Sequence, residues 1–165
     1  MTKIWFQREV YLREETEKKL RIAAQRLSGD HQKVSPGELA SVAWQMLLAF
    51  SSTEIYDSLA AYGFLPAEKR ELLPLVAKGL VKQSRGKPLT IVNRGVNTGA
   101  YVVARMLWVH VPSYQTLAER AKALFVTKQS LCETAVASLI AMSDDHIQDL
   151  YQHYAEVMNK KEVSL

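Results

Sequence analysis

The chain has 165 residues, a formal net charge of +4 and an isoelectric point near 9.2. Its hydrophobic content of 48%, with 23% charged residues, is typical of one globular domain spanning 1–165 and excludes a disordered chain. A single cysteine, Cys132, excludes an internal disulfide framework, and no apolar run approaches the ~18 residues that a bilayer crossing needs. We therefore expect a cytoplasmic protein with no membrane partner, in which Cys132 is a small core residue.

The first part of the chain predicts a strand over 8–12 and a helix over 12–27. Three glutamates near the start of that helix favour its positive N-terminal end. A loop around 28–32 leads to Ser35, which begins a second helix as a capping box with Glu38. The apolar residues of the second helix recur with a helical period. They are Leu39, Val42, Ala43, Met46, Leu47 and Phe50.

The middle of the chain predicts helices joined by a basic linker. A cap at 53–54 predicts one helix, and 67–83 predicts another that is interrupted by a proline. A turn or linker follows at 84–88, whereas 89–99 is ambiguous between strand and loop. The stretch 78–94 contains cations and no acidic residue, which is typical of a solvated loop or of a phosphate-contacting arm. These cations are Lys78, Lys82, Arg85, Lys87 and Arg94.

The last part of the chain predicts a strand over 106–111 and a helix that begins at Pro112 and Ser113. A break over 126–131, capped by Thr127, begins another helix. The residues of the two parts then correspond in order: Val10 with Leu107, Leu12 with Val109, Leu20 with Leu117, Ala24 with Ala121, Leu27 with Leu124, Ser35 with Thr127, Leu39 with Leu131, Ala43 with Ala135, and Leu47 with Leu139. A final helix begins near 143, with one apolar side formed by Ile147, Leu150, Tyr151, Tyr154 and Met158.

Strand, helix, turn and capped helix, occurring twice, resemble the ribbon-helix-helix family of DNA-binding proteins. The resemblance covers 3–50 and 104–142, with a helical insert and basic linker over 51–103 and a C-terminal helix over 143–165. The chain is similar in particular to the single-chain TraY-type and VirC-type accessory proteins of conjugation and T-DNA transfer. The resemblance implies a mostly α fold with a two-stranded antiparallel β-ribbon, in which both repeats form an intramolecular pseudo-dimer and the ribbon enters the major groove.

The alternation of strand side chains gives the candidate base contacts. If Val10, Leu12, Leu107, Val109 and Val111 point into the core, the outward face carries Gln7, Glu9 and Tyr11 opposite Met106, Trp108 and His110. A bulge or a register slip of one residue would instead turn Arg8 and Arg105 toward DNA. The candidate base-contacting set is therefore Gln7, Arg8, Tyr11, Arg105, Trp108 and His110.

The second helix of each repeat gives the candidate phosphate contacts, because a helix N-terminus favours an anion. In the family that this chain resembles, this helix end holds a DNA phosphate. The candidate set is Lys33, Ser35, Thr127 and Lys128, together with Lys82, Arg85, Lys87 and Arg94 of the basic stretch.

No catalytic motif stands out, so we expect no enzyme, no cofactor and no metal site. The expected partner is double-stranded DNA, bound by a monomer that assists a relaxase or another transfer protein. An alternative is a plasmid-type repressor or an antitoxin-like regulator, which needs the same ribbon. An alternative from another class is a helical protein-interaction adaptor that docks through 53–83 or through the C-terminal helix.

Overall fold

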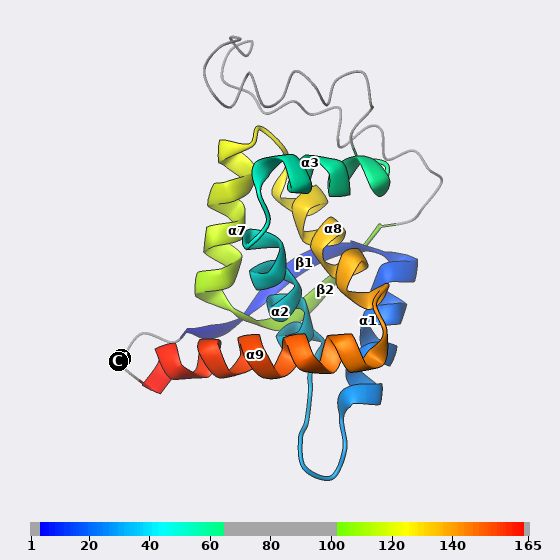
Figure 1. The fold of residues 1–165 in the computed structure, drawn as a ribbon, viewed down its shortest axis with the longest axis vertical. Coiled ribbons are helices and arrows are strands. Elements are labelled where there is room, and N and C mark those ends of the chain that lie inside the picture. The colour runs from blue at the N-terminus through cyan, green and yellow to red at the C-terminus, as the bar shows by residue number, and fades with distance from the viewer. Residues whose placement is uncertain (1–3, 65–101, 164–165) are drawn as a thin grey trace.

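The structure of the protein is a computed structural model that describes residues 4–64 and 102–163 (Figure 1). These residues are mostly helical with one two-stranded antiparallel sheet, as predicted. The expected helix over 67–83, the linker at 84–88, the segment 89–99 and the cations of 78–94 lie outside the described residues. The elements are β1 (Trp5–Arg13), α1 (Glu14–Leu27), α2 (Pro36–Leu48), α3 (Ser52–Ala61), β2 (Val102–His110), α7 (Val111–Ala123), α8 (Lys128–Ile140) and α9 (Asp144–Val163).

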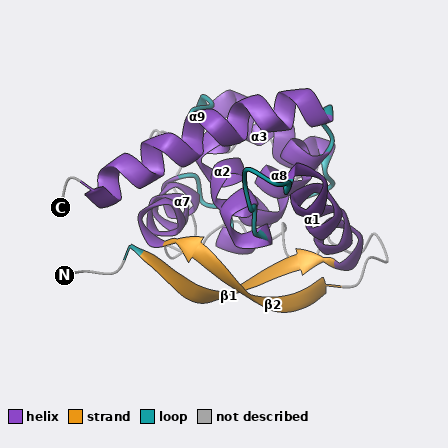
Figure 2. Ribbon diagram, turned by 90° about the horizontal axis from the view of Figure 1, so that it is seen from below, coloured by secondary structure: helices purple, strands orange, loops and turns teal. Residues whose placement is uncertain are grey.

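The two strands pair with each other although most of the chain separates them. Val10 lies opposite Arg105, and Leu12 lies opposite Val103, in a continuous antiparallel register. Figure 2 shows the resulting ribbon on one side of the helices, with no described element on its other side. The ribbon therefore has an inward face that packs on helices and an outward face that the described part of the chain leaves uncovered.

The elements differ from the predictions mainly at their ends. Both strands begin earlier in the sequence than predicted: β1 begins at Trp5, and β2 begins at Val102 and ends at His110. Val111, predicted to be an inward strand residue, is instead the first residue of α7, because a proline follows it and favours the first turn of a helix. The N-cap of α3 is Ser51 and not the predicted position 53. The Ser51 hydroxyl accepts a hydrogen bond from the Glu54 N–H.

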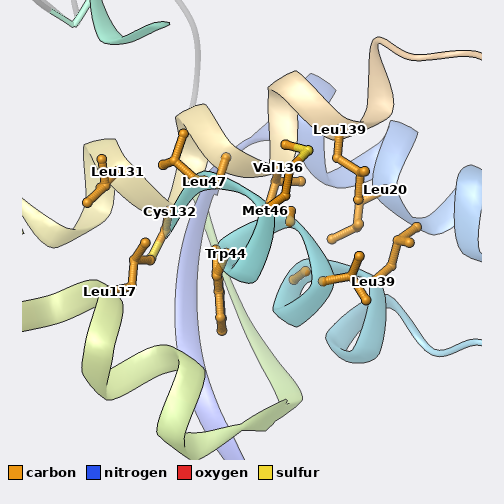
Figure 3. Packing of buried hydrophobic residues seen from close by; sticks show 14 of the residues in the cluster. Leu20, Leu39, Trp44, Met46, Leu47, Leu117, Leu131, Cys132, Val136 and Leu139 are labelled. Carbon is orange, nitrogen blue, oxygen red and sulfur yellow. The ribbon is translucent and has the colours of Figure 1, made fainter. Parts of the chain in front are cut away.

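The two central helices, α2 and α8, carry the matching apolar stripes and contact each other. Figure 3 shows side chains of these two helices meeting Leu20 of α1 and Leu117 of α7 in one cluster. The residues that correspond between the two helices are fully buried: Leu39, Ala43, Leu47, Leu131, Ala135 and Leu139. Phe50, predicted to belong to the stripe of the second helix, lies beyond the end of α2 and is only partly buried. Cys132 is buried in the same cluster, as predicted, and burial raises the pKa of its thiol to about 12.

The C-terminal helix α9 packs its apolar side on the body of the protein, as its sequence pattern predicted. Ile147, Tyr151 and Met158 are buried, and α9 contacts both α1 and α2. Figure 2 shows α9 on the side of the molecule away from the ribbon. This helix therefore completes the core and leaves the outward face of the ribbon untouched.

A buried carboxylate joins α8 to the start of α1. The side chain of Arg13, the residue before α1, forms no capping hydrogen bond for the helix. Glu133 Oε1 instead accepts a hydrogen bond from the Arg13 backbone N–H at 2.8 Å, and its Oε2 accepts one from the Thr16 hydroxyl at 2.8 Å. Burial raises the pKa of Glu133, although these hydrogen bonds act in the opposite direction. The junction between β1 and α1 thus depends on a residue from the second half of the chain.

Candidate nucleic-acid interface

The outward face of the ribbon is formed by alternate residues of both strands. Val10 and Leu12 are buried, so Gln7, Glu9 and Tyr11 point to the other side, where they are exposed. On β2 the exposed outward residues are Val102, Ala104, Met106 and Trp108. The structure thus agrees with the predicted outward placement of Gln7, Tyr11 and Trp108. Their contact with bases stays a prediction.

Tyr11 and Glu9 interact with each other on this face. The Tyr11 hydroxyl donates a hydrogen bond to Glu9 Oε1. This hydrogen bond and the negative charge of Glu9 raise the pKa of Tyr11. The outward face therefore presents a carboxylate that is oriented by a neutral phenol.

His110 does not belong to the outward face, and its prediction as a base contact was wrong. Its side chain is fully buried because the strand ends there and the residue becomes the N-cap of α7. Nδ1 lies 2.6 Å from the Ser113 hydroxyl, and the His110 backbone N–H donates to Ser41 Oγ at 3.0 Å. The proline two residues later was the sequence signal for this cap, because proline favours the first turn of a helix.

Arg8 and Arg105 lie on the inward side of the ribbon, so the alternative register that turned them toward DNA was wrong. Arg105 is opposite buried Val10, and its Nε is 3.4 Å from Oε1 of Glu17 in α1. The guanidinium of Arg8 lies over the Phe6 ring, 4.8 Å from its centroid. Both arginines therefore lie on the face of the ribbon opposite to Gln7, Tyr11 and Trp108.

The start of α8 lies beside β1 and carries no acidic residue in its first turn. The Thr127 hydroxyl accepts the Ser130 N–H at 3.2 Å, as an N-cap does. Lys128 is exposed, and its Nζ lies 4.6 Å from the centroid of the Tyr114 ring. A depression of about 70 Å³ marks this junction of helix and strand, and it is lined by Glu9, Val10, Tyr11, Tyr114, Lys128, Gln129 and Cys132.

The start of α2 lies behind β2 and has a different electrostatic character. Ser35 and Glu38 form the predicted capping box, with the Ser35 hydroxyl accepting the Glu38 N–H at 3.1 Å. The Glu38 carboxylate also accepts a hydrogen bond from the Tyr151 hydroxyl at 3.0 Å, which fixes it at this helix end. Pro36 has no N–H to offer, and Lys33 is exposed in the preceding loop. The two helices therefore differ in the charge of their first turns, because α2 carries the Glu38 carboxylate there and α8 carries no acidic residue.

Comparison of the chain with models of protein families, with curated proteins and with solved structures finds no significant match. Within 4–64 and 102–163, no helix has the length and apolar character needed to span a membrane. The same ranges contain no cluster of three or more acidic, histidine or cysteine side chains that could hold a metal ion.

Proposed function

We propose that this protein binds double-stranded DNA by placing the β1–β2 ribbon in the major groove. The observation that carries the proposal is the outward face of the ribbon, which exposes Gln7, Tyr11 and Trp108 while the opposite face packs on helices. A two-stranded ribbon fits the major groove, which is about 12 Å wide. Glutamine and tyrosine can hydrogen-bond base edges there, and the N-terminus of α8 with Lys128 lies beside the ribbon, suited to a phosphate.

We further propose that the two halves of the chain form a pseudo-dimer. Each strand is followed by two helices, in the orders β1–α1–α2 and β2–α7–α8. The pairing of β1 with β2 and the contact of α2 with α8 join equivalent elements of the two halves. This arrangement supplies within one chain the partner strand and partner helix that a ribbon-helix-helix chain otherwise obtains by dimerising.

The task that fits this proposal is that of an accessory factor in conjugative or T-DNA-like transfer, acting beside a relaxase. A plasmid-type repressor or antitoxin-like regulator remains the alternative, because it requires the same ribbon. The sequence resemblance supports the transfer role, and both roles place the same residues on DNA.

A second candidate is a protein-interaction adaptor that docks through the ribbon. It is favoured by the exposure of Met106 and Trp108, which are 58% and 49% accessible, next to the acidic Glu9. Large exposed apolar side chains commonly mark protein contacts. Of the two surfaces that the sequence suggested for this role, the apolar side of α9 is packed on the body of the protein, and 53–83 lies partly outside the described residues.

A binding experiment with matched variants separates the two candidates. The full chain is titrated with random and selected duplexes at ~50 mM salt, and again with Trp108→Ala, Gln7→Ala and Ile22→Ala. Ile22 is an exposed apolar residue on α1, 47% accessible, and serves as the control. We expect the two ribbon variants to lose ~1–3 kcal/mol of discrimination between selected and random DNA, and the control to lose none. No binding to any duplex would reject the DNA-binding function and favour the adaptor.

A further inference from the structure

The two strands of the ribbon present different chemistry on the same outward face. β1 contributes the polar residues Gln7, Glu9 and Tyr11, whereas β2 contributes Ala104, Met106 and Trp108. The register places a polar residue of β1 opposite an apolar residue of β2 at three successive outward positions: Gln7 opposite Trp108, Glu9 opposite Met106, and Tyr11 opposite Ala104. The face is thus divided lengthwise into a hydrogen-bonding half and an apolar half.

The apolar half can recognise only a limited set of groups in a major groove. Ala104 and Met106 donate no hydrogen bond, and Trp108 has only its indole N–H. The apolar group that a base pair presents in the major groove is the 5-methyl of thymine. Because Met106 and Trp108 are about half exposed, their side chains are free to contact such a methyl group. The strand β2 is therefore suited to thymine methyl groups.

The polar half recognises the exocyclic amines. The Glu9 carboxylate is an acceptor, and the hydrogen bond from Tyr11 holds one of its oxygens in place. A carboxylate accepts from N4 of cytosine and repels the acceptor edges of guanine, while Gln7 can pair with N6 and N7 of adenine. This half therefore favours cytosine and adenine on the strand that it faces.

We infer that the protein reads an asymmetric duplex site, in which β2 selects thymines by their methyl groups and β1 selects cytosine or adenine by their amines. The inference rests on the proposed DNA-binding function. Opposite residues of an antiparallel pair have Cβ atoms about 5 Å apart, comparable to the rise of one or two base pairs. The thymine-specific and amine-specific positions are thus neighbours within one site.

The test removes single methyl groups from the DNA. Duplexes that bind the full-length protein are selected from a random library, and each thymine of the selected site is then replaced by deoxyuridine. We expect a roughly fourfold loss of affinity at each methyl that β2 contacts, the ratio that corresponds to burying one CH₂-sized group. Met106→Ala should abolish this loss at one or two positions, because the exposed side chain can be removed without disturbing the core.

Two further variants assign the effect to one strand. Ile22→Ala should keep the full sensitivity to deoxyuridine. Glu9→Ala should also keep it, while relaxing the preference for cytosine or adenine at adjacent positions. Equal affinity for thymine and deoxyuridine at every position, in duplexes that still bind, would overturn this inference and leave the DNA-binding function standing. A deoxyuridine effect that Glu9→Ala removes as fully as Met106→Ala would overturn the division between strands. No binding to any duplex would overturn the DNA-binding function and this inference together.

Discussion

Gly37, in the first turn of α2, lies against the main chain of Trp108 in β2. A Cβ atom at position 37 would be 2.0 Å from the Trp108 carbonyl oxygen and 2.9 Å from its nitrogen. The absence of a side chain at Gly37 therefore lets the helix end approach the ribbon from behind while the Trp108 side chain extends outward. This contact sets the distance between α2 and the ribbon at Trp108, one of the candidate base-contacting residues.

Gly37→Ala should destabilise the fold and disturb the ribbon. The added carbon meets backbone atoms, which cannot rotate away, so we expect a loss of about 3 kcal/mol or more in the free energy of unfolding, above the usual range for overpacking. Urea unfolding measures this loss. Gly29→Ala is the matched control, because nothing lies within 4 Å of a Cβ at Gly29, and it should change the stability by no more than about 0.5 kcal/mol. Equal effects of the two substitutions would contradict the close approach of α2 to β2.

The buried Glu133 should make the stability depend on pH. Its pKa is raised by burial above the ordinary value of 4.5, so between 4.5 and the folded-state pKa the folded protein holds more protons than the unfolded chain. The contribution of Glu133 to stability is therefore fully present below pH ~4.5 and declines as the pH rises through the folded-state pKa. Comparison of urea midpoints for the protein and for Glu133→Gln isolates this effect, since all other groups are shared.

Glu133→Gln removes the charge and keeps an acceptor for the Arg13 N–H and a partner for Thr16. We expect the stability of this variant relative to the unmodified protein to increase as the pH rises above ~4.5. Glu133→Ala leaves both groups without their partner and should lose about 1–3 kcal/mol across the same pH range. A pH-independent difference between the unmodified protein and Glu133→Gln would show that the carboxyl group titrates in the folded state as it does in the unfolded chain.

The sequence was sufficient to predict the elements but not the roles of particular strand residues. Alternation over a strand and the 3.6-residue period over a helix are local signals, so the inward placement of Val10 and Leu12 and the packing side of α9 followed from them. His110 was misplaced because the alternation was extended to the last residue of β2, which is also the N-cap of α7 and is buried there. The outward-facing pairs were also only partly predicted, because cross-strand register depends on both strands and on the intervening chain.

The unequal helix ends illustrate a second limit of the sequence. Ser35 and Thr127 are both N-caps, as predicted. The hydrogen bond from Tyr151 to Glu38 arises only when α9 folds across α2, and a repeat alignment contains no sign of it. The contact of Gly37 with the Trp108 backbone is likewise a tertiary relationship between distant segments.

The two helix ends should contribute unequally to the salt dependence of DNA binding. Each neutralised phosphate changes the slope of log affinity against log salt by about 0.9. Lys128→Ala, beside the acid-free start of α8, should therefore flatten the slope by about that amount. Lys33→Ala should flatten it less, because the Glu38 carboxylate is fixed at the start of α2 and opposes an anion. Lys18→Ala is the control, since Lys18 pairs with Glu14 on the outer surface of α1. Equal slopes for the Lys33 and Lys128 variants would contradict the inequality of the two ends.

The pairing of β1 with β2 within one chain predicts a protein that folds as a monomer. Both partner strands and both central helices belong to the same molecule, so their association is intramolecular and independent of concentration. The midpoint of urea unfolding should then be constant over the micromolar range, whereas an obligate dimer becomes more stable as its concentration increases.

A disulfide across the ribbon identifies whether the paired strands belong to one chain. Glu9 and Met106 lie opposite each other, and both are exposed. The double variant Glu9→Cys/Met106→Cys, prepared with Cys132→Ser, should oxidise to a disulfide within a single chain. A covalent dimer as the main product would show that the ribbon forms between two molecules.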